Sequence, residues 1–431
     1  MNINEEAKQA KEASIGLAAS STSLKNKALA EIGVELNNRM QDIVNANKAD
    51  LERSEKENLP SPLLKRLKFD EGKILEVIDG IESLIKLTDP VGETLSTTKL
   101  DEDLELYKVS CPIGVIGVIF ESRPDALVQI STLCLKSGNA VLLKGGNEAR
   151  NTNKILTDVI RDACERVGIP SGWIQLLETR DDVKEMLKLD EFIDLIIPRG
   201  SNEFVKYIME NSNIPVLGHA DGICHCFVDE DIEMQTAVDI VVDSKTQYVA
   251  VCNATETLLV HQNIAPQFLP LLKKDMDKKN VELVGCKKVK EIIDVGAATE
   301  EDWKSEYLDY KLSIKIVDDL NEAINHINTY GSGHTDAIIT NIKENVEEFM
   351  NLVDSGNVFW NCSTRFSDGF RYGFGAEVGI STNKIHARGP VGLDGLLIYK
   401  YKMKGNGHIV SDYQNQTKTF KHEKINKDFN I

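Results

Sequence analysis

Alternating strand and helix patterns between residues 114 and 211 constrain the fold of this chain more than any other feature. The apolar runs in this region are too short for helices and are typical of buried parallel strands. The first of the intervening helices is expected to begin at Pro124 and to end at Gly138. The series predicts a doubly wound α/β domain. The expected strands are 114–120, 140–143, 174–177 and 192–197.

A second series of strand and helix patterns follows residue 252, and its size suits a separate α/β domain. A chain of 431 residues is long enough for two or three domains. Apolar residues at helical spacing before the first strand predict helices over 7–50 and 63–87. The expected strands of the second series are 257–260, 281–284, 313–317 and 337–339.

Residues 93–98 and 104–109 form a polar pattern that predicts a two-stranded ribbon. An isolated hairpin that buries little on itself is marginally stable. We therefore expect the ribbon to dock on something else, such as another subunit. A further strand is predicted near residue 396, and the charged stretch 417–431 is expected to be a frayed tail.

The composition excludes several classes of partner. A formal charge of −18 argues against a nucleic acid or an anionic membrane as partner. No apolar run approaches the roughly 20 residues that span a bilayer, and the N-terminus lacks a signal-peptide pattern. Eight scattered cysteines suit a reducing compartment, so a cytoplasmic location is expected. Cys224-His225-Cys226 has poor spacing for zinc, and no metal is expected.

Cys252 is the most interesting single residue. It is expected to lie with Asn253 in a turn, and the apolar strand begins only after three further residues. Thiols are most often buried as small hydrophobic groups. A turn at a strand edge instead favours a thiol that faces a cleft. Spacing alone leaves both interpretations open, the buried thiol and the nucleophile.

Two strand ends in the first domain suit a phosphate group. Lys144-Gly145-Gly146 follows one strand, and Gly200-Ser201 precedes a helix with free backbone N–H groups. Open sheets bind their ligands at this edge. The fingerprint G-x-G-x-x-G is absent, so any dinucleotide is bound by a route other than the usual Rossmann turn. A solvated lysine and an ordinary loop glycine are the simpler alternatives.

Arg123 lies at another strand end, beside a predicted helix start. Its guanidinium could bind a carboxylate or phosphate in bidentate fashion, or it could pair with Glu121 or Asp125. His219 is a loop histidine, and Glu377 lies in a glycine-rich segment where packing does not explain it. These residues are candidates for a functional site.

Five segments together resemble the gamma-glutamyl phosphate reductases, a family of the aldehyde dehydrogenase superfamily. The resemblance runs in matching order from the N-terminal helices to about Tyr401, and the last segment is highly specific. The family usually has a proline shortly before the cysteine, whereas this chain has Tyr248-Val249-Ala250-Val251. We interpret this as a local loop variant. The five segments are 120–125, 143–146, 197–201, 252–260 and 374–393.

The resemblance implies an aldehyde dehydrogenase-like α/β fold in three parts. These are a doubly wound NADP-binding domain, an α/β catalytic domain with the cysteine, and a β-ribbon for oligomerisation. The expected ranges are 1–92 and 110–247 for the NADP-binding domain, completed by about 366–390; 248–365 for the catalytic domain; 93–109 and 391–412 for the ribbon; and 413–431 for the tail.

The reaction implied by the resemblance is the NADPH-dependent reduction of L-glutamate 5-phosphate to the 5-semialdehyde, the second step of proline biosynthesis from glutamate. Cys252 would form a thioester as phosphate leaves. The family also implies a homo-oligomer, and the short-lived substrate suggests direct delivery by glutamate 5-kinase.

The resemblance also assigns roles to single residues. His219 stands where oxidising members have a glutamate that activates water, which suits a thioester that must not be hydrolysed. Asn147 stands where a glutamate often repels a 2′-phosphate, which favours NADP. The expected cofactor residues are Lys144, Gly145, Gly146, Asn147, Gly200, Ser201 and Glu377. The expected oxyanion or substrate-binding residues are Ser122, Arg123, Asn253, Lys384 and Arg388.

Three alternatives remain at this stage. Another acyl-phosphate or acyl-CoA reductase of the superfamily would need a different acyl pocket around Arg123 and Arg388. A non-catalytic oligomeric binding protein would not need Cys252, Lys144 and Glu377 together. A thiol hydrolase using Cys252 and His219 would leave the phosphate-binding strand ends without a role.

Overall fold

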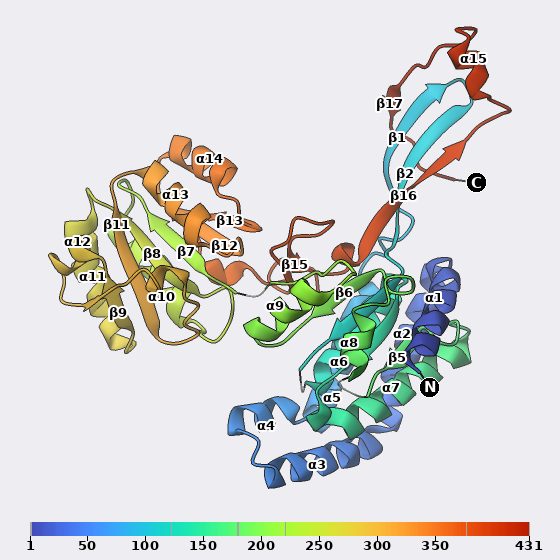
Figure 1. The fold of residues 1–431 in the computed structure, drawn as a ribbon, viewed down its shortest axis with the longest axis horizontal. Coiled ribbons are helices and arrows are strands. Elements are labelled where there is room, and N and C mark those ends of the chain that lie inside the picture. The colour runs from blue at the N-terminus through green and yellow to red at the C-terminus, as the bar shows by residue number, and fades with distance from the viewer. Residues whose placement is uncertain (1, 122, 179–180, 220, 376, 431) are drawn as a thin grey trace.

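The chain folds into three lobes, each built on its own sheet (Figure 1). The computed structural model describes residues 2–121, 123–178, 181–219, 221–375 and 377–430. Ser122, expected near the oxyanion, lies outside the described residues. The two larger lobes are α/β units with parallel strands, and the third is an antiparallel ribbon that projects from them. The predicted organisation, two α/β units and a β-ribbon, is confirmed.

The first lobe is a four-stranded parallel sheet in the order β5-β4-β3-β6 with helices around it. Its strands β3 and β4 are fully buried, as their continuous apolar sequences require. α6 begins at Pro124 and is followed by Gly138 with φ +76°, as the sequence predicts. The N-terminal region contains three helices before residue 57, because Ser21 and Arg39 interrupt the predicted pair.

The elements of this lobe are α1 (Ile3–Ala18), α2 (Thr22–Asn38), α3 (Met40–Lys56), α4 (Ser61–Leu67), α5 (Glu71–Lys86), β3 (Val115–Ile119), α6 (Pro124–Lys136), β4 (Ala140–Lys144), the 3-10 turn η1 (Asn147–Ala149), α7 (Arg150–Val167), β5 (Ile174–Leu176), α8 (Asp181–Met186), β6 (Leu195–Pro198) and α9 (Asn202–Asn211).

The second lobe is a seven-stranded parallel sheet in the order β10-β9-β11-β8-β7-β12-β13. β7 pairs with β8 and β12, near the middle of this sheet. The sequence interpretation assigned residues 1–92 and 110–247 to the first domain, and the pairing of β7 with strands of the second sheet corrects the boundary at 247. The sequence of β7 is an apolar run like those of the strands in the first sheet. This pattern alone does not show that β7 pairs with strands of the second sheet.

The elements of the second lobe are β7 (Cys224–Val228), α10 (Met234–Thr246), β8 (Thr255–His261), α11 (Ala265–Lys278), β9 (Glu282–Gly285), α12 (Lys287–Lys290), β10 (Gly296–Ala297), η2 (Asp302–Lys304), β11 (Lys311–Val317), α13 (Leu320–Tyr330), β12 (Thr335–Ile339), α14 (Lys343–Leu352) and β13 (Asn357–Trp360).

The ribbon is a four-stranded antiparallel sheet in the order β16-β2-β1-β17. The predicted hairpin is formed by β1 and β2. The predicted strand near residue 396 is β16, which pairs with β2. The C-terminal stretch is not frayed as expected, because β17 pairs with β1 and Phe429 packs against Tyr107 at 5.2 Å between ring centroids. The elements are β1 (Thr94–Asp101), β2 (Leu104–Pro112), β16 (Leu397–Lys404), α15 (Val410–Gln414) and β17 (Glu423–Ile425).

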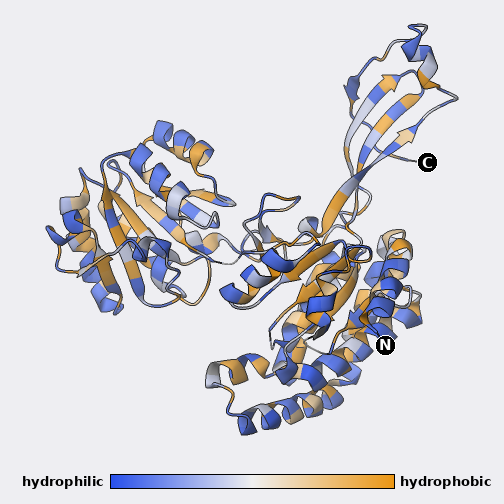
Figure 2. Ribbon diagram, viewed as in Figure 1, coloured by the Kyte–Doolittle hydropathy of each residue, from blue (hydrophilic) through white to orange (hydrophobic). Residues whose placement is uncertain are grey.

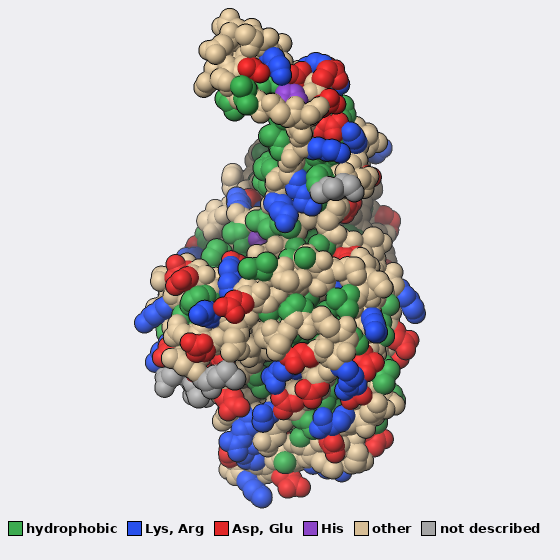
Figure 3. Space-filling view, turned by 90° about the vertical axis from the view of Figure 1, so that its right-hand side faces the viewer, with side chains coloured by type: hydrophobic (Ala, Val, Ile, Leu, Met, Phe, Trp, Pro, Cys, Tyr) green, Lys and Arg blue, Asp and Glu red, His purple; other side chains and the backbone are tan. Residues whose placement is uncertain are grey.

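The outer strand β16 carries exposed hydrophobic side chains, including Tyr401 and Met403. The space-filling view shows hydrophobic side chains along the ribbon and the surface at its base (Figure 3). A strand edge with unpaired backbone groups and apolar side chains is suited to pairing with another chain.

Residues 361–396 connect the seven-stranded sheet to the ribbon and pass between the two larger lobes (Figure 1). Val378, Val391 and Leu396 from this segment pack into the core of the first lobe. Glu377, in the same segment, lines a cavity together with residues of both larger lobes. Its elements are η3 (Thr364–Phe366), β14 (Gly379–Ser381), β15 (Gly389–Val391) and η4 (Asp394–Leu396).

Hydrophobic residues are concentrated in the strands, and the outer helices are mostly hydrophilic toward solvent (Figure 2). Among the residues that the structure describes, no helix combines the length and the hydrophobicity that a membrane crossing requires.

Candidate active site

Cys252 lies in a turn directly before β8, a strand near the middle of the seven-stranded sheet. The N–H of Ala254 donates to the carbonyl of Val251 at 3.2 Å and closes the turn. Cys252 as a whole residue is half-buried, and it lines a cavity of about 280 Å³ between the two larger lobes. Cys252 therefore lies in a turn that faces a cleft, as the sequence favours.

The backbone of Gly222, in the loop before β7, lies directly against the cysteine turn. A Cβ atom on Gly222 would lie 2.2 Å from the carbonyl oxygen of Cys252 and 2.5 Å from its Cα and Cβ. The Cys224 thiol donates to the same carbonyl at 3.1 Å. Only glycine fits at position 222 without displacing the nucleophile.

His334 is the side chain in direct polar contact with the thiol. Its Nε2 lies 3.1 Å from Cys252 Sγ, and the residue is fully buried at the start of β12. Its Nδ1 lies 2.8 Å from the hydroxyl of Thr335. Sequence reasoning missed this residue, although a polar His-Thr pair after Gly331-Ser332-Gly333 at a strand start was a usable signal.

Both members of the pair are neutral at neutral pH. Burial raises the pKa of the Cys252 thiol to about 12, with added repulsion from Glu306 and Glu377. Burial also lowers the pKa of His334 well below its ordinary value, and His219 adds to this shift. The contact therefore joins a neutral thiol and a neutral imidazole nitrogen. The reactive thiolate forms only when this proton is taken away.

His219 also faces the cavity, but it is not the partner of the thiol. Its Nδ1 lies 3.0 Å from the carbonyl oxygen of Ile380, and its ring stands edge-on to His334 at 5.0 Å between centroids. Burial lowers the pKa of His219. This argues against a thiol hydrolase that uses a Cys252–His219 pair, because the histidine at hydrogen-bonding distance from the Cys252 thiol is His334.

Glu377 and Gly200, both predicted to bind the cofactor, line the Cys252 cavity. One carboxylate oxygen of Glu377 accepts from the N–H of Gly369 at 2.8 Å, and burial raises the pKa of this group. Asn253 also lines the cavity, but its side-chain N–H donates to the carbonyl of Ser367 at 2.7 Å. One of the two side-chain N–H groups of Asn253 is therefore already used within the fold.

Arg199 and Arg365 are cavity residues that sequence reasoning missed. Burial lowers the pKa of the Arg199 guanidinium, and the nearby carboxylate of Glu377 opposes this shift. Arg365 is almost fully buried and its Nε donates to Gln247 at 2.9 Å. An arginine at the carboxyl end of β6, beside the predicted Gly200-Ser201 helix start, was the available signal.

Arg123 lies outside the Cys252 cavity and pairs with Asp125 at 2.7 Å, which is the simpler of the two sequence interpretations. It lines an adjoining cavity of about 860 Å³ that also includes Arg199 and Ser201. Ser201 directly precedes α9 and makes no side-chain cap hydrogen bond. Arg123 could reach a ligand only from this outer cavity.

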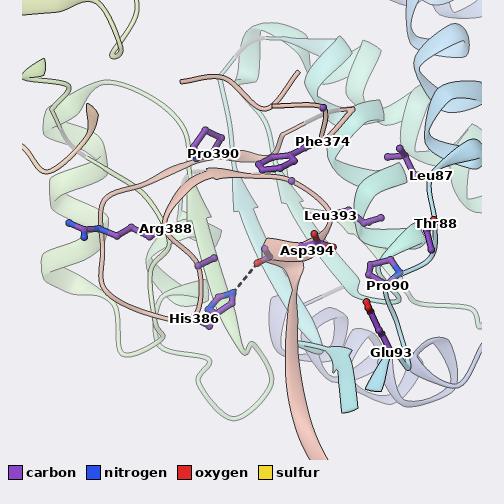
Figure 4. A pocket seen from close by; sticks show the side chains of 14 residues that line it. Leu87, Thr88, Pro90, Glu93, Phe374, His386, Arg388, Pro390, Leu393 and Asp394 are labelled. Carbon is purple, nitrogen blue, oxygen red and sulfur yellow. Dashed lines mark hydrogen bonds between the residues drawn. The ribbon is translucent and has the colours of Figure 1, made fainter. Parts of the chain in front are cut away.

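Lys384 and Arg388 are not brought to the thiol. Both pair with Asp354, and Arg388 additionally donates to the Asp354 carbonyl at 2.9 Å. Arg388 borders a separate cavity of about 730 Å³, where its guanidinium points away from Phe374 and Leu393 (Figure 4). The two ion pairs connect the segment after β14 to the second lobe.

A pocket of about 400 Å³ lies at the carboxyl end of β4. It is lined by all four residues of the predicted cofactor segment, Lys144 to Asn147, together with Arg150 and Lys154. A Cβ on Gly145 would lie 2.2 Å from the side-chain nitrogen of Asn153, so a larger residue here would have to displace that amide group. The pocket offers bare backbone and three basic side chains, the chemistry that suits a phosphate group.

Comparisons with known proteins agree with this geometry. Residues 2–311 match the model of the aldehyde dehydrogenase family. The chain is 73% identical over 429 residues to a gamma-glutamyl phosphate reductase of Acetivibrio thermocellus, covering 100% of both chains. It is 70% identical to one of Pelotomaculum thermopropionicum, covering 100% of this chain and 99% of the relative.

Solved structures give the same result. The crystal structure of a gamma-glutamyl phosphate reductase of Thermotoga maritima is 42% identical, with a TM-score of 0.93 and coverage of 95% of this chain and 100% of that one. An acetylating aldehyde dehydrogenase of Geobacillus thermoglucosidasius is 16% identical with a TM-score of 0.63, covering 94% and 97% of the two chains, and shares the fold.

Proposed function

Because this chain belongs to the gamma-glutamyl phosphate reductases, within the aldehyde dehydrogenase family, we propose that its central cavity reduces L-glutamate 5-phosphate to L-glutamate 5-semialdehyde through a thioester on Cys252. This is the second step of proline biosynthesis from glutamate. The observation that supports the site most strongly is the 3.1 Å contact between the Cys252 thiol and His334 in the cavity that also holds Glu377.

The first step is acyl transfer to the thiol. Cys252 Sγ attacks the acyl carbon while His334 Nε2 takes the thiol proton, which is required because burial disfavours a free thiolate. The bond between the acyl carbon and the phosphate oxygen breaks. The proton on His334 passes to the departing phosphate, so that the imidazole returns to its neutral form.

Charge on the carbonyl oxygen develops beside the cysteine turn. The backbone N–H of Cys252 is the natural donor to this oxygen. Asn253 contributes by holding the turn, because its side chain donates to Ser367. Arg199 and Arg365 are placed to bind the phosphate and the α-carboxylate, since guanidinium groups pair with both.

NADPH fits the residues around the first sheet. The backbone at Gly145 and the basic side chains of Lys144, Arg150 and Lys154 would bind the phosphates of NADPH. Glu377, in the Cys252 cavity, would bind the nicotinamide ribose. Asn147 adds no negative charge beside a 2′-phosphate, which favours NADP over NAD. When bound, NADPH supplies the hydride that converts the thioester to the aldehyde.

The assembly and location follow from the same proposal. The exposed edge and apolar side chains of β16 support a homo-oligomer built through the ribbon. Eight free cysteines suit a reducing compartment and hence the cytoplasm. Direct delivery of the substrate by glutamate 5-kinase stays a prediction, to be checked by adding a trap for free substrate to the coupled reaction.

The reaction run in reverse tests the proposed function. Purified full-length protein should reduce NADP⁺ in the presence of glutamate 5-semialdehyde only when phosphate is added, and NAD⁺ should be a poorer acceptor. Cys252→Ala should abolish the reaction, while His386→Ala, in the separate cavity, should retain it. Activity with coenzyme A in place of phosphate, or activity that survives in Cys252→Ala, would contradict the proposal.

A further inference from the structure

Three side chains that bind soft metal ions meet in the Cys252 cavity. The ligand atoms of His219, Cys252 and His334 all lie within 4.8 Å of one another. The residues come from three separate places: the loop before β7, the turn before β8 and the start of β12. Cys224-His225-Cys226, the group considered in the sequence, is not part of this cluster.

Hydrogen bonds orient both imidazoles for metal binding. The Ile380 carbonyl can only accept, so Nδ1 of His219 carries the hydrogen and its Nε2 keeps a lone pair. Nδ1 of His334 lies against the Thr335 hydroxyl, and its Nε2 faces the thiol. Histidines that bind metals are usually fixed in this way, by a hydrogen bond at the nitrogen that does not bind.

We propose that His219, Cys252 and His334 form a three-ligand site for Zn²⁺, and that an ion bound there reversibly blocks the nucleophile. One thiolate and two imidazoles are donors that zinc prefers, and three protein ligands leave a fourth position open to the cavity. Binding forms a sulfur–zinc bond and releases the thiol proton to solvent. The thiol so bound cannot attack an acyl carbon.

The charges around the cavity permit a dication. Arg199 and Arg365 oppose it, and the carboxylates of Asp368 and Glu377 offset these two positive charges. The thiolate formed on binding then adds one negative charge at the ligand itself. Hard oxygen-seeking ions such as Mg²⁺ have no comparable donor set here.

The inference rests on the side-chain geometry and holds whatever substrate the cavity accepts. Its primary readout is therefore binding, measured without substrate. Chelator-treated, full-length protein is titrated with Zn²⁺ against a fluorescent zinc indicator, and alkylation of each cysteine by iodoacetamide is followed by peptide mass spectrometry.

The expected result is one tightly bound Zn²⁺ per chain and loss of Cys252 alkylation, reversed by chelator, with no protection by Mg²⁺. Alkylation of Cys286, a half-buried cysteine elsewhere, serves as the internal control and should not change. His219→Ala should weaken binding by at least about tenfold, as loss of a metal-binding side chain requires. His386→Ala should bind zinc like the unmodified protein.

Other results would overturn the inference. These are the absence of stoichiometric binding, protection of Cys252 that survives in His219→Ala, or equal zinc affinity in Cys252→Ser. Co²⁺ provides an independent check, because coordination by thiolate produces a sulfur-to-cobalt charge-transfer band. That band should appear in the unmodified protein and be missing in Cys252→Ser. A protein that reduces glutamyl phosphate but binds no zinc would refute this inference and leave the proposed function intact.

Discussion

Replacing His334 with glutamine tests the proton transfer that the structure assigns to the Cys252–His334 pair. Glutamine keeps a polar group near the thiol but cannot accept its proton. General base catalysis contributes about 100- to 10,000-fold to a rate. With a thiol pKa of about 12, the protein has almost no spontaneous thiolate at neutral pH, so we expect His334→Gln to lose a factor in that range.

Stopped-flow kinetics in the reverse direction isolate this step. Mixing the enzyme with glutamate 5-semialdehyde and NADP⁺ without phosphate limits the reaction to one turnover, and the burst of NADPH absorbance reports attack by the thiol and hydride transfer. The burst rate of His334→Gln should fall by about 100- to 10,000-fold. It should also rise about tenfold per pH unit, because hydroxide then replaces the missing base.

The control for this experiment is the variant His386→Gln. His386 lines the separate cavity of Figure 4, so the burst rate of this variant should not change. Replacing a fully buried imidazole also removes its contact with Thr335, so the thermal midpoint of each variant is measured first. A folded His334→Gln protein with a burst rate within tenfold of the unmodified one, and with the same pH profile, would refute the role of His334 as base.

Three further predictions concern the thiol, the cofactor and the fold. Alkylation of Cys252 by iodoacetamide in the metal-free protein should accelerate about tenfold per pH unit between pH 7 and 11, because the thiolate fraction rises until the pKa of about 12 is reached; a plateau near pH 8 or 9 would contradict this. Asn147→Glu should raise the KM for NADPH far more than that for NADH, since a carboxylate there repels only the 2′-phosphate; equal changes in the two steady-state values would remove this residue from the cofactor site. Lys245→Met should lower the free energy of unfolding by about 3–5 kcal/mol in urea titrations, because it leaves the carboxylate of fully buried Glu256 without its ion-pair partner; a loss under about 1 kcal/mol would mean that Glu256 is held neutral.

Much of the fold could be predicted because its strands are continuous apolar runs. The turn at Cys252, the strand after it and the helix start at Pro124 are all local patterns. The boundary at residue 247 was wrong because strand pairing is not local, and β7 has the same apolar character as the strands of the first sheet. The C-terminal strand was missed since it is short and charged, and becomes ordered by pairing with β1.

Residues close to their own strand ends were the easiest candidates to find in the sequence. Of those predicted to bind the cofactor, Lys144 and Gly145 line the pocket at the end of β4, whereas Gly200 and Glu377 line the Cys252 cavity, and their binding role stays a prediction. His334 follows Cys252 by 82 positions, and the local signal, a polar His-Thr pair after Gly331-Ser332-Gly333, does not show that its side chain faces Cys252.

The long basic side chains were the hardest to place. Lys384 and Arg388 lie in the segment of highest family resemblance, yet their direction depends on Asp354, which comes from another part of the chain. Side-chain direction across a domain boundary is a property of the tertiary fold, and spacing along the sequence does not determine it.

The central claim is that Cys252 carries the acyl group. Its most direct test is mass spectrometry of the enzyme quenched in acid after incubation with glutamate 5-semialdehyde and NADP⁺ in the absence of phosphate. We predict the added mass of one glutamyl group on the peptide that contains Cys252, its removal by phosphate or hydroxylamine, and its absence in Cys252→Ser. An acyl group on a different residue, or full turnover with no acylated peptide at any time, would contradict the account.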